Sequence, residues 1–279
     1  MSDTSGQGRH RVADGVAVAD PAGQRRSVFG GRPTLIGHRG SGRGDVGGLL
    51  ENSRESLLAG ARAGLRWVEC DIRRTADDEL VIGHFPTWAD GSFIARMDLS
   101  DARRQGAVTL RELLVDLPPE VALNLDVKTA LPDALRPREA TTVGLLAPVA
   151  ADLALERPVL VSSFDPSVVG YLREVAPQIP RALLTWLGFP LRKAIPAAVH
   201  LGADVVAAHW SSFGPNEWDH APVFITAAEA IEVAHTAGVE VMSWCPQAEV
   251  ARALFKAGLD AAVIDDVPTT MAQLDGVAE

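Results

Sequence analysis

Acidic side chains fall at short, regular spacings within two apolar runs of this chain. Glu69 and Asp71 lie two residues apart in one run, and Asp126 lies near the end of a later one. Residues two apart on a strand point to the same side, so the carboxylates of Glu69 and Asp71 should face together. Two such anions raise each other's pKa unless a cation intervenes. Three carboxylates without His or Cys suit a hard cation, Mg²⁺ or Ca²⁺, completed by water and substrate oxygens.

Two histidines and two cations accompany these acids. His38 follows the first apolar run and His84 ends a short extra one. A phosphodiester needs a proton taken from its nucleophile and one given to its leaving alkoxide, and imidazole suits both tasks near neutrality. Arg39 and Lys128 can hold the non-bridging oxygens of a phosphate, Arg bidentately. These residue types together indicate metal-assisted cleavage of a phosphodiester.

Each of these signals has a purely structural alternative. Glu69 and Asp71 could instead form a salt-bridged rim with Arg39, Arg73 or Lys128, and a single histidine is more often a hydrogen-bonded rim residue. The combination of three acids with two histidines favours the catalytic interpretation. Three tryptophans could line the alcohol side of a substrate, although packing is the favoured explanation for each one taken singly; they are Trp186, Trp210 and Trp244. The other histidines receive no role; they are His10, His200, His220 and His235.

The elements that position these residues alternate short apolar runs with longer helical patterns, which is typical of parallel βα units. Eight runs are predicted strands: 34–37, 67–72, 121–127, 159–162, 181–185, 204–208, 240–243 and 261–264. Helices are predicted at 53–63, 110–117, 138–155, 166–175, 193–201, 227–237 and 248–257. No Gly-rich dinucleotide loop follows the first strand, so an open doubly wound sheet is less favoured than a (β/α)8 TIM barrel. The polar residues then lie at the carboxyl ends of the strands, on the catalytic rim.

A small insertion follows the second strand, with an extra strand at 80–84 and a decorated loop at 85–108. The domain boundaries are predicted at 1–32, a disordered or poorly ordered N-terminal leader, and 33–279, the barrel. The leader lacks the apolar segment of a signal peptide, no apolar run is long enough to span a bilayer, and Cys70 and Cys245 suggest no disulfide framework. The cytoplasm is the expected location. A net charge of −10 gives no attraction for nucleic acid or anionic membranes.

A series of motifs in this order resembles the glycerophosphodiester phosphodiesterase family. The matching segments are Gly37-His38-Arg39-Gly40, Glu51-Asn52-Ser53, Glu69-Cys70-Asp71, Thr75-Ala76-Asp77, Val81-Ile82-Gly83-His84, Asp126-Val127-Lys128, Ser163-Phe164-Asp165 and the stretch from Leu259 to Pro268. They correspond to the family's HRG, EN-T/S, E-x-D, T-x-D-G, V-x-x-HD, E-x-K, SFD and closing G-x-D-x-x-x-T-D-x-P patterns. The similarity spans residues 33–268.

The resemblance implies a TIM barrel with one divalent cation, Mg²⁺ or Ca²⁺, held by Glu69, Asp71 and Asp126. It implies that His38 and His84 are the catalytic pair. Substrate would contact Arg39, Glu51 and Lys128, with Trp244 added from the residues themselves. Four positions depart from the family pattern: Leu50 replaces Pro, Phe85 replaces Asp, Asp126 replaces Glu and Asp265 replaces Thr.

The expected function is metal-dependent hydrolysis of glycerophosphodiesters to glycerol 3-phosphate and an alcohol, a reaction of lipid metabolism. A lysophospholipase D or sphingomyelinase D-like enzyme is the alternative within the class, because an Asp third ligand occurs there and Phe85, Trp88 and Phe93 could form an apolar lip. A non-catalytic phosphoester-binding barrel is the alternative outside the class. The expected partner is a small phosphodiester or a lysolipid, without stable membrane insertion; the oligomeric state stays open.

Overall fold

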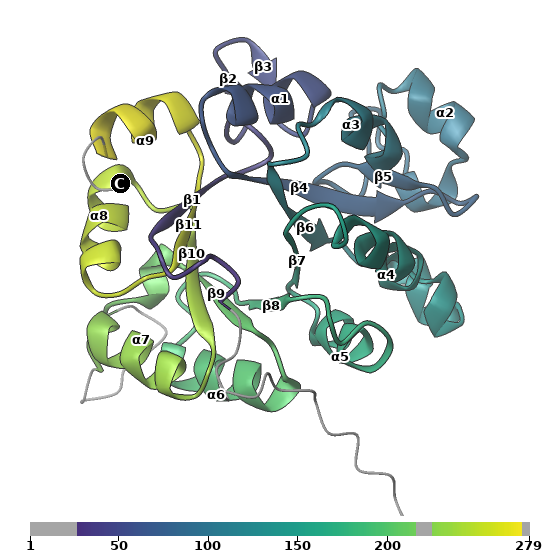
Figure 1. Ribbon diagram of the computed structural model, residues 1–279. Helices are drawn as coiled ribbons and strands as arrows, with labels where there is room; N and C mark the ends of the chain where they lie inside the picture. The colour runs from purple at the N-terminus through teal and green to yellow at the C-terminus, as the bar shows by residue number, and fades with distance from the viewer. Residues whose placement is uncertain (1–26, 216–224, 275–279) are drawn as a thin grey trace, which may run out of the picture.

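The computed structural model describes residues 27–215 and 225–274. Within them, eight parallel strands close into a barrel surrounded by helices (Figure 1), which confirms the predicted (β/α)8 fold. The barrel strands are β1 (Thr34–Gly37), β4 (Trp67–Arg74), β6 (Ala122–Val127), β7 (Val159–Ser163), β8 (Arg181–Leu184), β9 (Val205–His209), β10 (Glu240–Trp244) and β11 (Ala261–Ile264). Neighbours in sequence pair in this order, and β1 pairs with both β11 and β4 to close the ring.

The helices that follow these strands agree with the predicted ones to within a few residues. They are α1 (Arg54–Arg62), α3 (Leu110–Asp116), α4 (Thr142–Leu153), α5 (Pro166–Val175), α6 (Leu191–Leu201), α7 (Ala227–Thr236) and α8 (Ala248–Lys256). Local signals explain their bounds. Thr226 begins α7 with a reciprocal capping box to Glu229. Gly202, with φ of 76°, ends α6 in the left-handed conformation that glycine adopts without steric cost.

Several elements lie in segments where no regular element was predicted. They are the hairpin of β2 (Asp45–Val46) and β3 (Leu49–Leu50), α2 (Leu99–Arg104), α9 (Val267–Leu274) and the single turns Ile94–Arg96, Leu131–Leu135 and Trp210–Ser212. The start of the helix predicted at 138–155 is instead a separate turn, Arg138–Ala140, before α4. The extra strand is shorter than predicted: β5 (Leu80–Ile82) pairs antiparallel with the end of β4. His84 therefore lies in a loop two residues beyond the strand, not at its end.

The barrel interior has two layers of side chains. The layer toward the amino ends of the strands, the lower one, is apolar, and the layer toward their carboxyl ends, the upper one, is polar. Ile36, Trp67, Leu160 and Met242 belong to the buried apolar cluster inside the ring, where side chains of successive strands interdigitate. Two larger apolar clusters lie between the strands and the helices. Because inward positions alternate with outward ones, the next inward residue along β4 after Trp67 is Glu69. The apolar layer thus supports an acidic layer directly above it.

The predicted leader falls mostly outside the described residues, and the division at residue 32 stays a prediction. Its last residues, from Ser27 on, lie against the barrel. Phe29 is buried and packs edge-on against Trp67, with ring centroids 5.5 Å apart. Glu240 at the start of β10 accepts hydrogen bonds from the Ser27 hydroxyl at 2.5 Å and the Val28 amide at 2.7 Å.

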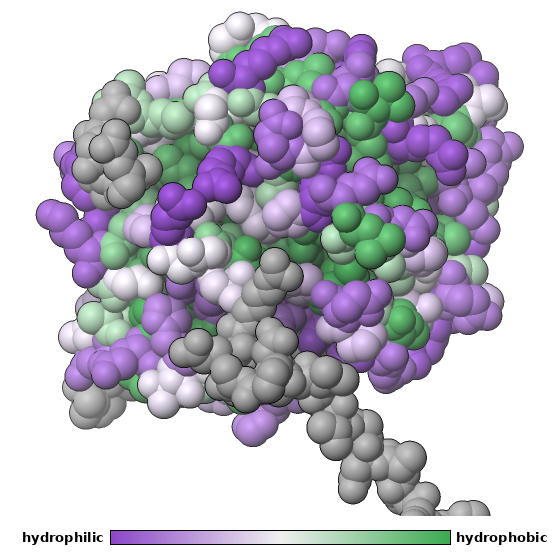
Figure 2. All heavy atoms as spheres, in the orientation of Figure 1, coloured by the Kyte–Doolittle hydropathy of each residue, from purple (hydrophilic) through white to green (hydrophobic). Residues whose placement is uncertain are grey.

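The outer surface in the view of Figure 2 mixes hydrophilic and hydrophobic residues, with hydrophilic ones prominent around its edge. Among the described residues, none of the helices combines the length and apolar character needed to cross a bilayer.

Candidate active site

Three buried carboxylates converge at the upper layer of the barrel. Asp71 on β4 and Asp126 on β6 are direct partners in the parallel register, and Glu69 lies one inward position below Asp71. Their exposed fractions are 3% for Glu69, 1% for Asp71 and 6% for Asp126. One oxygen from each lies within 4.8 Å of the others. Cys70 between them faces the helices, as the alternation of side chains along a strand requires.

Burial and mutual repulsion act on two of these acids. Burial, together with the nearby Asp71 and Asp126, raises the pKa of Glu69 well above its usual range. Burial likewise raises the pKa of Asp126, against the opposing charge of Lys128. Glu69 Oε1 and Asp126 Oδ1 are buried and have no hydrogen-bond partner among the described residues. Buried carboxylate oxygens without a partner are costly, and a cation would relieve that cost.

The pKa of Asp71 shifts in the opposite direction, because hydrogen-bond donors and cations surround this carboxylate. Burial acts to raise its pKa, but the hydrogen bond from His84 and the charges of Lys128 and Arg39 outweigh it and lower the pKa of Asp71. Lys128 Nζ lies 2.9 Å from Asp71 Oδ1 and also contacts Asp126 Oδ2. Arg39 Nε lies 3.3 Å from Asp71 Oδ2. Asp71 is therefore held ionised at the centre of the cluster.

The residues at this position fit a hard divalent cation. Oxygen ligands around Mg²⁺ or Ca²⁺ are separated by about 3 to 5 Å, and the oxygens here meet that spacing. The charge count agrees, since four carboxylates of Glu51, Glu69, Asp71 and Asp126 face the three cations Arg39, Arg73 and Lys128. The salt-bridged rim proposed as the alternative is thus present in part, but it leaves one negative charge without compensation.

His84 is held beside Asp71 by three contacts. Its Nδ1 lies 3.1 Å from Asp71 Oδ2, and its Nε2 lies 3.2 Å from Arg39 Nη2. Arg73, the next inward residue of β4, donates from Nη2 to the His84 carbonyl at 2.6 Å and from Nε to the Gly83 carbonyl at 3.0 Å. Arg73 therefore fixes the backbone of the loop that carries His84.

His38 lies near the acids, just after β1. Its Nε2 is 3.9 Å from Glu69 Oε2, and its Nδ1 is 2.5 Å from Asp265 Oδ1. Although burial opposes it, the hydrogen bond with His38 lowers the pKa of Asp265. Cys245 also contacts this pair, with Sγ 3.2 Å from Asp265 Oδ1. The predicted histidines thus approach different acids of the cluster, His38 approaching Glu69 and His84 approaching Asp71.

The buried Arg39 forms an ion pair with the partly buried Glu51 within the same site. Arg39 Nη1 lies 2.6 Å from Glu51 Oε1, and Glu51 Oε2 accepts from the Gly44 amide at 2.5 Å. The backbone amide of Arg39, which has φ of 51°, donates to Glu69 Oε2 at 2.8 Å. All the predicted ligands, histidines and phosphate-side residues therefore lie in one cluster.

Asn52 is a site residue to which sequence reasoning gave no role. Its Nδ2 donates to Asp71 Oδ2 at 2.7 Å, and its Oδ1 accepts from the Asp71 amide at 3.2 Å. Its φ of 57° is in the left-handed region, which asparagine tolerates better than most residues. The Glu-Asn-Ser motif was the signal for it, but only Glu51 was given a role there.

Trp244 lies in an aromatic wall that adjoins the acids, defined here as Phe164, Trp186, His209, Trp210 and Trp244. Trp244 donates from Nε1 to the Thr185 carbonyl at 3.2 Å and packs on His209, with ring centroids 4.4 Å apart. Phe164 stacks on Trp186 at 4.5 Å, and Trp186 is 65% exposed. Lys128 Nζ lies 5.4 Å from the Phe164 ring centroid, which connects the wall to the acidic cluster.

Comparison with known proteins agrees with this geometry. The model of the glycerophosphoryl diester phosphodiesterase family matches residues 38–269. A probable glycerophosphodiester phosphodiesterase 2 of Mycobacterium tuberculosis is 34% identical over 92 residues, which cover 29% of this chain and 34% of that protein. The match to this curated relative thus spans about a third of its length.

Solved structures show the same fold. A phosphodiesterase of Oleispira antarctica, in complex with the product sn-glycerol-3-phosphate, has a TM-score of 0.70 and 23% identity, covering 90% of this chain and 100% of that one. A glycerophosphodiester phosphodiesterase of Thermotoga maritima has a TM-score of 0.67 and 16% identity, covering 86% and 98%. The family match extends from His38 through β11 and into α9. This chain therefore belongs to the glycerophosphoryl diester phosphodiesterase family of hydrolases.

Proposed function

We propose that this protein hydrolyses glycerophosphodiesters to glycerol 3-phosphate and an alcohol, with one Mg²⁺ or Ca²⁺ ion bound by Glu69, Asp71 and Asp126. The observation that carries the proposal is the convergence of these three buried carboxylates, with His38 and His84 beside them. Family membership and the product bound to the Oleispira antarctica relative support the reaction. A bound divalent cation would neutralise negative charge on the non-bridging oxygens of the phosphate.

The hydrogen bonds of the two histidines assign them different roles. Arginine is only a donor, so His84 Nε2, which faces Arg39 Nη2, must accept, and its proton lies on Nδ1 toward Asp71. His84 acts as the general base, on water or on a neighbouring glycerol hydroxyl, once Arg39 Nη2 turns to a phosphate oxygen and releases the Nε2 lone pair. Asp265 holds His38 at Nδ1, so His38 Nε2 faces the acid cluster, 3.9 Å from Glu69 Oε2. His38 is the general acid that protonates the leaving alkoxide.

The remaining residues of the site bind and orient the substrate. Lys128 uses two of its contacts on Asp71 and Asp126, which leaves one N–H to donate to a phosphate oxygen. Arg39, fixed by Glu51, adds a second positive charge on the same side. Trp244 and the rest of the aromatic wall lie next to Lys128 and form the side on which the alcohol binds.

Removal of the metal tests this proposal. The protein, treated with a chelator and then dialysed, should release no glycerol 3-phosphate from glycerophosphocholine, glycerophosphoethanolamine or glycerophosphoglycerol. Addition of Mg²⁺ or Ca²⁺ should restore turnover, because the cation would bind the carboxylate oxygens that Lys128 and Arg39 leave without a partner, Glu69 Oε1 and Asp126 Oδ1. A coupled assay for glycerol 3-phosphate and an assay for the free alcohol measure both products.

Chelated protein that turns over these diesters at an undiminished rate would contradict the metal dependence. Protein that binds Mg²⁺ by calorimetry and cleaves no diester would favour the non-catalytic barrel. A second candidate substrate, a lysolipid, is favoured by two exposed rings: Phe85, 64% exposed, packs against the His84 ring at 4.9 Å, and Phe93 is 50% exposed. Product analysis with glycerophosphocholine and lysophosphatidylcholine in parallel separates the two.

Asn52→Gly should lower the affinity for the divalent cation by about 10- to 100-fold, the usual cost of losing a residue that orients a ligand. Glycine keeps the positive φ of this position and removes only the amide that holds Asp71. Isothermal titration with Mg²⁺ measures the effect. Gly91→Ala, at another positive φ in a surface loop with open space around it, is the control for general backbone strain. Wild-type affinity in Asn52→Gly would show that Asp71 needs no such support.

A further inference from the structure

A second cluster of metal-ligating side chains lies behind His38. Three different donor atoms meet there: His38 Nδ1, Cys245 Sγ and Asp265 Oδ1. Sγ lies 3.6 Å from Nδ1 and 3.2 Å from Oδ1, and the nitrogen and the oxygen are 2.5 Å apart. This cluster is separate from the three carboxylates, because it uses the imidazole nitrogen that points away from them.

We propose that His38, Cys245 and Asp265 form a second metal site, which binds Zn²⁺ and inhibits the enzyme. Around tetrahedral zinc, with bonds of about 2.3 Å to sulfur and about 2.0 Å to nitrogen and oxygen, ligand atoms are about 3.3 to 3.6 Å apart. The two separations from Sγ already lie near these values. Only His38 and Asp265 must move apart, by less than about 1 Å, when zinc replaces the proton between them.

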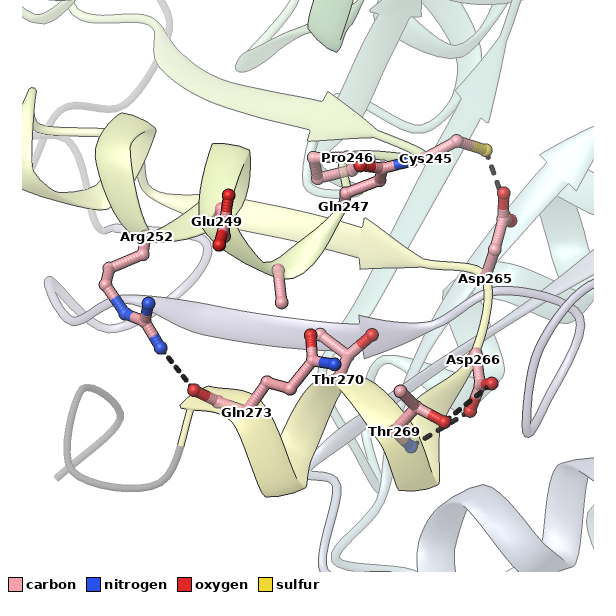
Figure 3. Close-up of a pocket in the computed structure, with 11 residues that line it drawn as sticks. Cys245, Pro246, Gln247, Glu249, Arg252, Asp265, Asp266, Thr269, Thr270 and Gln273 are labelled. Carbon is pink, nitrogen blue, oxygen red and sulfur yellow. Dashed lines mark hydrogen bonds between the residues drawn. The ribbon is translucent and has the colours of Figure 1, made fainter.

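The donor types select this ion over the hard cation of the neighbouring site. Thiolate and imidazole prefer borderline ions such as Zn²⁺, whereas Mg²⁺ and Ca²⁺ prefer oxygen alone. Cys245 has φ of 56°, at the turn where β10 ends, and this turn directs Sγ toward Asp265 at the end of β11. Figure 3 shows the two side chains pointing toward each other.

The cluster also has room for a fourth ligand. Cys245 and Asp265 form one end of a pocket of about 660 Å³ between α8 and α9, which Figure 3 shows. The charged residues that line the pocket are three acids, Glu249, Asp265 and Asp266, and one cation, Arg252. This acidic lining favours entry of a cation, and water from the pocket can complete three protein ligands to a tetrahedron.

Inhibition follows from the proposed role of His38 and therefore rests on the proposed function. When zinc binds, the Cys245 thiol proton and the proton between His38 Nδ1 and Asp265 both leave to solvent, zinc takes Nδ1, and the imidazole is left neutral with its one N–H at Nε2. A neutral imidazole N–H is a far weaker acid than imidazolium, and it has no lone pair to accept a proton. His38 can then neither donate to the leaving alkoxide efficiently nor act as a base.

Cobalt spectroscopy tests the site without depending on activity. The full chain in excess Mg²⁺, which fills the carboxylate site, is titrated with Co²⁺, a spectroscopic substitute for zinc. The wild type should show thiolate-to-cobalt charge-transfer absorption in the near ultraviolet, and Zn²⁺ should abolish it by displacement. Cys245→Ser should lose the band. Cys70→Ala, which removes the other cysteine, and Asp126→Asn, which alters only the carboxylate site, should both keep it.

A parallel assay measures the zinc concentration that halves diesterase turnover in zinc-buffered, Mg²⁺-saturated medium. Each variant is compared with its own rate without zinc, and Cys245→Ser should need at least about 10-fold more zinc than the wild type. No charge-transfer band in the wild type, or a band that persists in Cys245→Ser, overturns the site. A band that depends on Cys245 without any inhibition confirms the site and instead overturns the proposed role of His38.

Discussion

Replacement of either histidine should nearly abolish turnover: His38→Ala and His84→Ala should each lower kcat by at least about 10²-fold. Each imidazole is positioned by a carboxylate at Nδ1, Asp265 for His38 and Asp71 for His84. No other imidazole in the described residues approaches the three acids as these two do, so neither loss can be compensated from within the site. Steady-state release of glycerol 3-phosphate at saturating Mg²⁺ measures the effect.

The nature of the leaving group distinguishes the two roles. With an aryl phosphodiester, whose phenolate leaves without a proton, His38→Ala should recover most of its lost rate because a general acid is then not needed. His84→Ala should stay impaired with both substrates because the nucleophile still needs a base. The opposite pattern would exchange the two roles. His200→Ala, an exposed histidine in the last turn of α6, is the control and should keep wild-type rates.

Asp71→Asn should have an effect of similar size, at least about 10²-fold on kcat, together with weaker metal binding. Asp71 contacts Arg39, Asn52, His84 and Lys128. Its negative charge therefore acts on the bound metal ion, on the side chains of Arg39 and Lys128, and on the proposed base His84. An asparagine of the same shape keeps the packing but replaces one carboxylate oxygen with an N–H donor. That donor faces either His84 or Lys128, which are themselves donors.

Kinetics and Mg²⁺ calorimetry on Asp71→Asn measure both consequences. Asp152→Asn, an exposed acid on α4, gives the matched charge change away from the site. Circular dichroism confirms that each variant is folded, since removing one partner of a buried ion pair is destabilising by about 3 to 5 kcal/mol. A folded Asp71→Asn variant with normal metal affinity and turnover would exclude Asp71 from the cation site.

Much of the fold followed from local patterns. Continuous apolar runs marked all eight barrel strands to within two residues at each end, because strands buried on both faces have no polar alternation. Helix α9 was missed because Val267–Leu274 contains Pro, Thr and Gln and has only a weak apolar stripe; its packing against α8 holds it in place. The β2–β3 hairpin was missed because two-residue strands carry no periodic signal.

The sequence by itself predicted which side chains gather in one cluster. The strand alternation placed Glu69 and Asp71 on one face, and the motif series pointed to Asp126, His38, His84, Arg39 and Lys128. Chemical type and local spacing were sufficient there, because residues two apart on one strand share a face in any sheet.

The tertiary structure alone decided which residues contact the two histidines. His38 and Asp265 are 227 residues apart, yet each follows directly on a strand end, and Gly37 pairs with Ile264 where β1 meets β11. Closure of the barrel therefore sets them side by side, and the turn at Cys245 adds the thiol. Such contacts depend on the register between the first and last strands, which no local pattern in the chain encodes.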